Sequence, residues 1–206
     1  GTNNSNMKTT VAAARLNAGP NWTCIAMPRS SLGEWEAGID DAMANNRVCE
    51  GVVFTDGITA QAEIMAMYAK QVAIENEYAR SLFFMVPTNA MTTSQTWAEF
   101  IAAHDVIQDG VAAETIMLVP EVYAGWCGAL AGRLCHEGVS IADSPMRTAS
   151  GSIVGLAALP ADKDDVVYNM SHAKALNDAR GSVPQIYADY DGFYVSDGMT
   201  LATEAS

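Results

Sequence analysis

The sequence is short of basic residues. Only 11 of its 206 residues are Lys or Arg, four of them Lys, against 24 Asp plus Glu, which gives a formal charge of −13. A field of this sign repels phosphate backbones and anionic lipid head groups, so the composition disfavours binding to nucleic acids and to membrane surfaces. The charged fraction is also low, at 17%, while 50% of the residues are hydrophobic. With so few charged residues, the chain is expected to need another surface that covers part of its apolar exterior.

Cysteine and histidine are scarce and poorly spaced for chemistry. The four cysteines show no CxxC spacing, and Cys127 and Cys135 lie about 12 Å apart along a predicted helix, too far for a disulfide. We therefore expect reduced, buried thiols in a cytoplasmic protein. The histidines are dispersed, and we expect structural or surface roles for them and not metal binding. They are His104, His136 and His172.

Several signatures of function are missing. No apolar run reaches the ~18 residues of a membrane-spanning helix, and no signal peptide opens the chain. No phosphate-binding GxxxxGK[ST] or GxGxxG motif follows a predicted strand, and no serine lies in a GxSxG motif. The chain starts at Gly1 without Met and stops at Ser206, which we interpret as the ends of a fragment.

What the sequence does contain is an alternation of short apolar runs with longer helical patterns, which is typical of an α/β fold. The runs are apolar at every residue, and this indicates parallel strands buried on both faces. The predicted strands are residues 22–28, 51–55, 82–86, 115–119 and 139–142. The predicted helices are residues 32–46, 58–80, 95–107 and 123–137. We expect a three-layer, doubly wound, mostly parallel sheet over residues 20–143.

Local signals refine two of the predicted helices. Thr93 or Ser94 is expected to cap the helix over residues 95–107. Small residues recur along the helix over residues 123–137, and they allow the backbone of a sheet or another helix to approach closely. The glycines among them are Gly125, Gly128 and Gly132.

The pattern changes after Asp143. A charged turn at residues 160–165 is followed by a short helix near residues 172–179 and by two strand-like pieces. Asp191-Gly192 between these pieces predicts a tight hairpin. We expect three parts: a leading helix and cut N-terminus in residues 1–19, the α/β domain in residues 20–143, and the start of a smaller α+β region in residues 144–206.

Three acidic residues follow predicted strands. Ligands of doubly wound sheets bind beyond the carboxyl ends of the strands, so Asp56, Glu121 and Asp143 could together hold Mg²⁺ for phosphoryl transfer or hydrolysis. No Asp-x-Asp follows the first predicted strand and no Lys lies close to these loops, and acids after strands also serve as helix caps. A magnesium-dependent enzyme is therefore the alternative hypothesis, and a plain binding module of flavodoxin-like architecture is a third.

Two stretches near the chain's end carry a family resemblance. Residues 176–180 read LNDAR at the end of a predicted helix, and residues 192–202 read GFYVSDGMTLA in a predicted strand. Both resemble the C-terminal core of contractile tail sheath proteins from myophages, Mu-like prophages and related injection systems. Residues 9–28, which include AAARLNAG at residues 12–19, are similar to the helix that leads into the first sheet strand in Mu-like members.

The resemblance implies a structural subunit that is not an enzyme and needs no cofactor. Sheath subunits stack as hexameric rings around a tail tube, exchange strands through terminal arms, and contract by a rigid-body rearrangement. The implied partners are other sheath subunits and the tail tube protein, with no nucleic acid and no membrane. The implied location is the virion tail, after assembly in the cytoplasm of the bacterial host.

The resemblance also singles out residues for assembly or for orienting the core. They are Asp178, Arg180, Tyr194 and Asp197. Asp178 and Arg180 would form a charged helix end near the hairpin. An equally good reading is a local helix-terminal pair that contributes ~0–1 kcal/mol.

Overall fold

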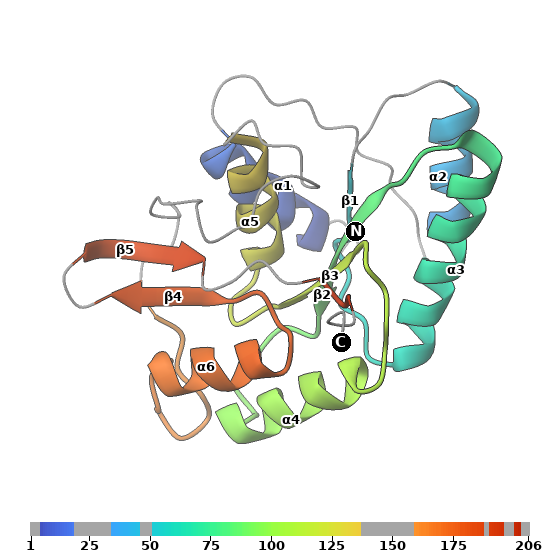
Figure 1. The fold of residues 1–206 in the computed structure, drawn as a ribbon. Coiled ribbons are helices and arrows are strands. Elements are labelled where there is room, and N and C mark those ends of the chain that lie inside the picture. The colour runs from blue at the N-terminus through green and yellow to red at the C-terminus, as the bar shows by residue number, and fades with distance from the viewer. Residues whose placement is uncertain are drawn as a thin grey trace.

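Three parallel strands form the central sheet, in the order β1-β2-β3 (Figure 1). The computed structural model describes residues 5–18, 34–45, 51–136, 159–187, 190–195 and 200–202. The strands are β1 (Gly51–Val53), β2 (Phe83–Thr88) and β3 (Ile116–Pro120). In the register of the sheet, Val52 pairs with Phe84, and Phe84 pairs with Ile116. The predicted α/β class is confirmed.

Helices cover both faces of the sheet, and a small antiparallel hairpin lies beside it (Figure 1). The helices are α1 (Ser5–Asn17), α2 (Trp35–Ala44), α3 (Gln61–Tyr78), α4 (Trp97–Gln108), α5 (Trp126–His136) and α6 (Met170–Asp178). The hairpin consists of β4 (Pro184–Tyr187) and β5 (Tyr190–Val195). No helix among the described residues is both long and apolar enough to cross a membrane.

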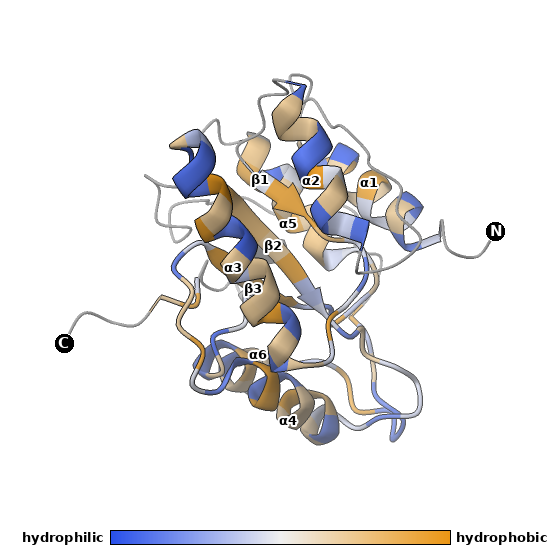
Figure 2. Ribbon diagram, turned by 90° about the vertical axis from the view of Figure 1, so that its right-hand side faces the viewer, coloured by the Kyte–Doolittle hydropathy of each residue, from blue (hydrophilic) through white to orange (hydrophobic). Residues whose placement is uncertain are grey.

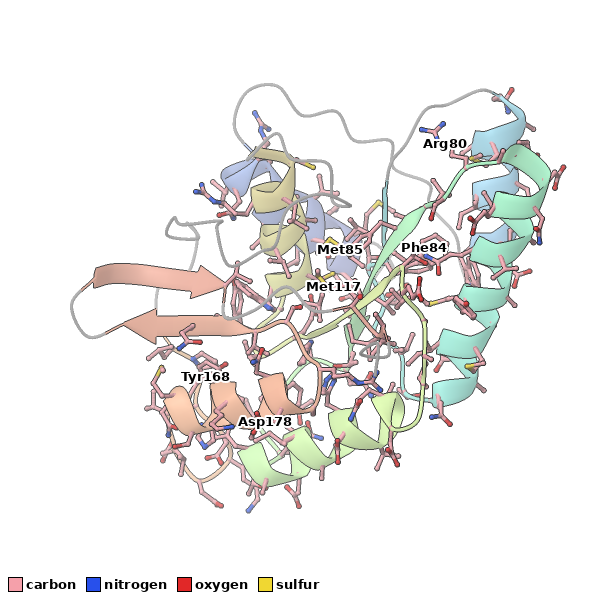
Figure 3. The ribbon with its side chains drawn as sticks, in the orientation of Figure 1. Arg80, Phe84, Met85, Met117, Tyr168 and Asp178 are labelled. Atoms are coloured by element: carbon pink, nitrogen blue, oxygen red, sulfur yellow. The ribbon has the colours of Figure 1, made fainter. Side chains whose placement is uncertain are left out.

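Side chains of β2 and β3 alternate between two separate cores. Phe84 packs with Ile64 of α3 in the core that α2, α3 and the end of α4 close. Met85 and Met117 pack with Leu130 of α5 in the core on the opposite face. Figure 3 shows Phe84 on the side of α3 and the two methionines on the side of α5. This alternation follows from the two-residue period of a strand, and it explains why every residue of β3 is buried.

A third cluster joins α4 to the segment before α6. Trp97 packs with Tyr168, whose ring centroid lies 5.1 Å away, and it stacks on His172 at the same separation. The Tyr168 hydroxyl donates a hydrogen bond to the carbonyl oxygen of Pro184, at 2.9 Å. The cluster therefore anchors both α6 and the hairpin to the N-terminal end of α4.

Helices α1 and α5 pack backbone against backbone. A Cβ atom added at Gly128 would overlap the carbonyl group of Thr10, and one added at Gly132 would overlap that of Ala14. The predicted role of these glycines is thus confirmed, and the element that approaches them is the helix α1. The close contact fixes one face of α1 against the body of the molecule and leaves its other face outward.

Both predicted ends of α3 and the predicted cap of α4 are wrong. Helix α3 does not begin at Ile58, because Ile58 extends the sheet by a parallel bridge to Thr88. It ends before Arg80, since Ala79 adopts a left-handed conformation with φ of 52°. Helix α4 is capped by neither Thr93 nor Ser94 but by Thr96, whose hydroxyl accepts from the Glu99 N–H at 3.2 Å. Glu99 returns a 2.8 Å bond by accepting from the Thr96 N–H, which completes a capping box.

The predicted position of the hairpin turn is also wrong. Tyr187 pairs with Tyr190, so Asp191 and Gly192 lie within β5 and not at the connection. Ladder pairing decided the register over the local Asp-Gly signal. The strands predicted at residues 22–28 and 139–142, and the acid Asp143, lie outside the described residues. The three-part division of the chain stays a prediction.

The thiol prediction is confirmed in part. Cys127 is a buried thiol in α5, while Cys135 in the same helix is exposed. Leu134, the preceding residue, is buried in the core beside the sheet, so the exposure of Cys135 follows from its place on the opposite side of the helix.

Candidate functional site

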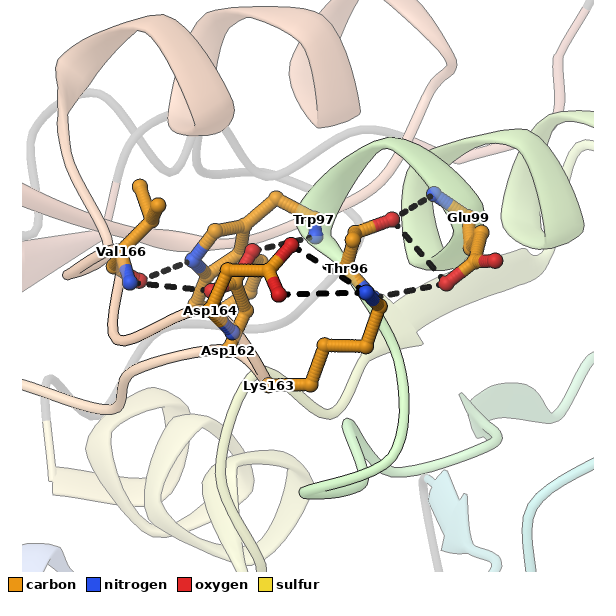
Figure 4. A network of polar contacts seen from close by, with 7 residues as sticks. All are labelled: Thr96, Trp97, Glu99, Asp162, Lys163, Asp164 and Val166. Carbon is orange, nitrogen blue, oxygen red and sulfur yellow. Dashed lines mark hydrogen bonds and ion pairs between the residues drawn. The ribbon is translucent and has the colours of Figure 1, made fainter.

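The first polar network ties the loop before α6 to the start of α4 (Figure 4). The carboxylate of Asp162 accepts hydrogen bonds from the backbone N–H groups of Trp97 at 3.2 Å, and of Asp164 and Val166 at 2.9 Å. The indole of Trp97 donates in turn to the carbonyl oxygen of Val166 at 2.7 Å. Asp162 lies 65 residues after Trp97 in the sequence, and its carboxylate adds a second acceptor to the Thr96 cap at the start of α4.

The charge on Asp162 is held by these contacts. Burial opposes its ionisation, but hydrogen bonds from the N–H groups of Val166, Trp97 and Asp164 outweigh burial and hold the pKa of Asp162 below its ordinary value. The positive end of the α4 dipole acts in the same direction. This helix terminus is already occupied by a carboxylate of the chain, so it binds its own loop and not a foreign anion.

The second network centres on the buried imidazole of His104. Its Nδ1 lies 3.3 Å from the Thr88 hydroxyl of β2, and its Nε2 lies 3.1 Å from the carbonyl oxygen of Ala179, at the end of α6. Burial lowers the pKa of His104 to about 4, although the hydrogen bond to Ala179 and the nearby charge of Asp105 raise it. The imidazole is therefore neutral near pH 7, with Nε2–H donating to Ala179 and Nδ1 accepting from Thr88. It is structural, as predicted.

The third network is built by Arg180, one of the residues singled out from the sequence. Its guanidinium donates to the side chain of Gln108 at 2.7 Å and to the carbonyl oxygens of Gln108 at 2.6 Å and Val111 at 2.9 Å. A longer contact of 3.5 Å reaches the carbonyl oxygen of Leu201. Leu201 itself is fully buried in the core of the sheet. Arg180 therefore ties the ends of α4 and α6 to residues near the end of the chain.

Of the other residues singled out, Asp178 is described with its side chain, and it is not brought together with Arg180. Asp178 makes an exposed ion pair with Lys174, one turn earlier in α6, at 2.6 Å. Tyr194 pairs along the backbone with Gln185 in the hairpin. Asp197 lies outside the described residues. Asp178 and Arg180 thus form no pair with each other, since Arg180 turns toward α4 while Asp178 faces outward.

The acidic rim shows no metal-binding arrangement among the described residues. Asp56 accepts a hydrogen bond from the side chain of Asn6 at 3.1 Å. Glu121 accepts one from the Gly125 N–H at 3.3 Å, where α5 begins. Within the described part of the chain no three His, Cys, Asp or Glu side chains gather as a cation would require. The third acid of that hypothesis, Asp143, is not described.

Glu121 is nevertheless an unusual acid. Burial raises its pKa to about 7, while hydrogen bonds from the N–H groups of Cys127 and Gly125 lower it. The pKa values of two neighbours, Tyr123 and Cys127, are also raised. Burial is the larger cause, and the negative charge of Glu121 is the smaller one. The role that these contacts support is that of a helix-terminal acceptor for α5.

Comparison with known proteins identifies the family of this chain. Residues 1–199 match the N-terminal domain of the DUF2586 family. The chain belongs to the DUF2586 family. The "Putative tail sheath protein" of Haemophilus phage HP1 (strain HP1c1) is 31% identical over 214 residues, which cover 99% of this chain and 56% of that protein. The chain therefore spans little more than half the length of this relative. No solved structure matches this chain.

Among the described residues of this DUF2586 chain, two helices enclose a hollow at the surface. A shallow groove of about 570 Å³ runs between α4 and α6. Its lining consists of Ala98, Ile101, Ala102, Asp105, Ala175, Asp178 and Ala179. Small apolar side chains thus form the floor, with one acid on each helix. Figure 3 shows Asp178 on α6 beside α4.

Sequence reasoning missed most of the residues that tie the DUF2586 domain together. The turn at residues 160–165 was visible as a charged loop, but its contact with α4 depends on Asp162 reaching Trp97 across the fold. His104 was visible only as a histidine at helical spacing. A buried polar residue within an apolar stripe, such as His104 or Gln108, is the one local signal that could have found these networks.

Proposed function

We propose that this chain is part of a structural subunit of a contractile phage or prophage tail sheath. Its subunits assemble into stacked rings around the tail tube and contract by rigid-body rearrangement. The observation that carries this function is the 31% identity, across 99% of the chain, to a phage protein named as a tail sheath protein. The finer assignment to Mu-like prophages and to hexameric rings rests on the resemblance of the LNDAR and GFYVSDGMTLA stretches.

The polar chemistry of the described residues agrees with a structural role. Asp162, His104 and Arg180 bond mainly to backbone groups of other elements, so they hold helices in place. A subunit that moves as a rigid body needs such ties between its elements, because forces applied at one contact must reach another without local unfolding. The implied partners are further copies of the subunit and the tail tube protein, in the virion tail and, before assembly, in the bacterial cytoplasm.

Location in the virion tests this function directly. An antibody raised against the chain is expected to label the tails of particles from the parent phage or induced prophage along their whole length. Labelling confined to the head, or absence of the protein from purified particles, would contradict a sheath role.

The magnesium-dependent alternative is tested separately. The sheath proposal predicts no tight Mg²⁺ or Mn²⁺ binding in a calorimetric titration. Tight binding of either cation by the wild type, lost in the D56A variant and also in the D143A variant, would favour the enzyme instead. A variant of the exposed Glu114, E114A, controls for the loss of one negative charge.

A further inference from the structure

Two outward surfaces of the molecule have opposite chemistry. The outer face of α1 carries Lys8, Ala12, Arg15 and Leu16, all exposed. Residues four and seven or eight apart lie on one side of a helix, so these side chains form a single stripe. Helix α1 contains no Asp or Glu, although the whole chain carries a charge of −13. Lys8 and Arg15 make no ion pair with any described residue.

The groove between α4 and α6 has the matching properties. Its floor is made of four alanines and Ile101, with Asp105 on α4 and Asp178, which also pairs with Lys174 at the exposed surface of α6, on the other helix. Helix α4 contains no Lys or Arg. Asp105 accepts only a neutral partner among the described residues, the amide of Gln108 at 2.7 Å. The carboxylate of Asp105 therefore lacks a described cation.

The most exposed large apolar side chains lie beside these charges. Val106, next to Asp105 on α4, is 74% exposed, and Leu16, next to Arg15 on α1, is 63% exposed. They have the highest exposed fractions among the large hydrophobic residues described. An isolated exposed apolar side chain needs no explanation. Here, however, Val106 lies beside an acid and Leu16 lies beside a base, so the two sites are complementary in charge.

The two surfaces lie at different ends of the molecule. In both Figures 1 and 2, α1 lies in the upper part of the view while α4 and α6 form the lower edge. One copy therefore cannot bring its own α1 to its own groove, but a neighbouring copy can.

We infer that the outer face of α1 docks in the α4–α6 groove of the next copy of this chain, with Lys8 and Arg15 against Asp105 and Asp178 and with Leu16 on Val106. This inference rests on the proposed sheath function and names the contact between its subunits. A contact between different patches is head-to-tail, and it generates closed rings or open helical arrays. Stable interfaces bury at least about 1,200 Å², and we expect one helix in one groove to bury less, so that the contact is weak alone and is strengthened by repetition in an assembly.

Charge reversal on each side tests the contact. In the intact gene product, K8E/R15E and D105K/D178K are each expected to lower the self-association constant at least tenfold in sedimentation equilibrium, and to abolish ordered assemblies in negative stain. A 1:1 mixture of the two variants is expected to recover association, because each reversed surface meets its reversed complement. The chain carrying all four substitutions is expected to recover it alone.

The controls separate charge from folding and from function. E75K/E77K adds the same charge as D105K/D178K, at the exposed end of α3, and is expected to associate like the wild type. Thermal unfolding of each variant reports on its folding, and the recovery by mixing cannot occur with unfolded partners. Wild-type association through this contact also weakens as salt rises.

The possible failures are distinguishable. Variants that assemble as well as the wild type, or a mixture that stays as dissociated as its components, overturn the inference while the sheath function stands. A wild-type protein that forms no assembly at all contradicts the proposed function and this contact together.

Discussion

His104 sets one pH dependence at the scale of the residue. Its pKa is about 4 in the folded protein against an ordinary 6.5, so the unfolded chain takes up a proton first as the pH falls. The free energy of unfolding therefore declines between about pH 6.5 and pH 4, by roughly 3 kcal/mol in full. In H104Q this part of the decline is expected to vanish. Urea denaturation of both proteins across that range measures it, and parallel profiles would contradict the neutral, buried imidazole.

Glu121 acts in the opposite direction. Its pKa is raised to about 7 from 4.5, so its contribution to stability is present below pH 4.5 and is lost as the pH rises through 7. E121Q keeps a neutral acceptor for Gly125 and removes this loss. We expect it to unfold at higher urea than the wild type at about pH 8 and at similar urea at about pH 4.5. E114Q removes an exposed charge as the control, and an E121Q variant less stable at both pH values would refute this reading.

Arg180 is expected to matter for stability far more than Asp178. R180K keeps a positive charge but loses the planar fork that reaches Gln108 and Val111, so we expect a loss of about 2 kcal/mol. D178N breaks only an exposed pair with Lys174 and is expected to cost less than about 1 kcal/mol. Chemical denaturation compares them, and equal effects would mean that Arg180 is not a tie between elements.

At the scale of the element, the strands of the sheet were predictable because a strand that is buried on both faces is a continuous apolar run in the sequence. β2 and β3 are such runs, and both were found within two residues of their observed ends. Boundaries set by tertiary contacts were not predictable. Ile58, predicted to begin α3, instead bridges Thr88 of β2. The cap of α4 is a different case, because the Thr96–Glu99 capping box is a local signal that the prediction of Thr93 or Ser94 missed.

The residues of the candidate site show the same limit. Arg180 was found through a family resemblance, but its partners Gln108 and Val111 are about 70 residues away, beyond any local pattern. Small residues in α5 predicted a close approach without revealing that α1 makes it. What the sequence conveys is which faces are apolar, and the pairing of faces is decided by the folded chain.

The α1–α5 contact supports a prediction at this scale. Gly to Ala in a helix usually stabilises it by ~1 kcal/mol, but G128A and G132A would drive a methyl group into the backbone of Thr10 or Ala14. We expect both variants to detach α1 and to raise hydrogen exchange across its amides. G110A, which meets no atom nearby but has a positive φ, serves as a destabilised control in which α1 stays protected. Full protection of α1 in G128A would contradict the packing.

At the scale of the whole molecule, the sparse charge fits a subunit that buries much of its surface against neighbours. Charged residues are depleted at the centres of protein interfaces, and a chain with 17% charged residues can cover more of its surface that way than a free protein can. The acid excess has one candidate use in the groove between α4 and α6, opposite the basic face of α1.

Negative-stain microscopy of the intact gene product at high concentration tests the central claim most directly. The account predicts rings or tubes, formed by the protein alone or around its tail tube protein. A compact monomer under both conditions would contradict it.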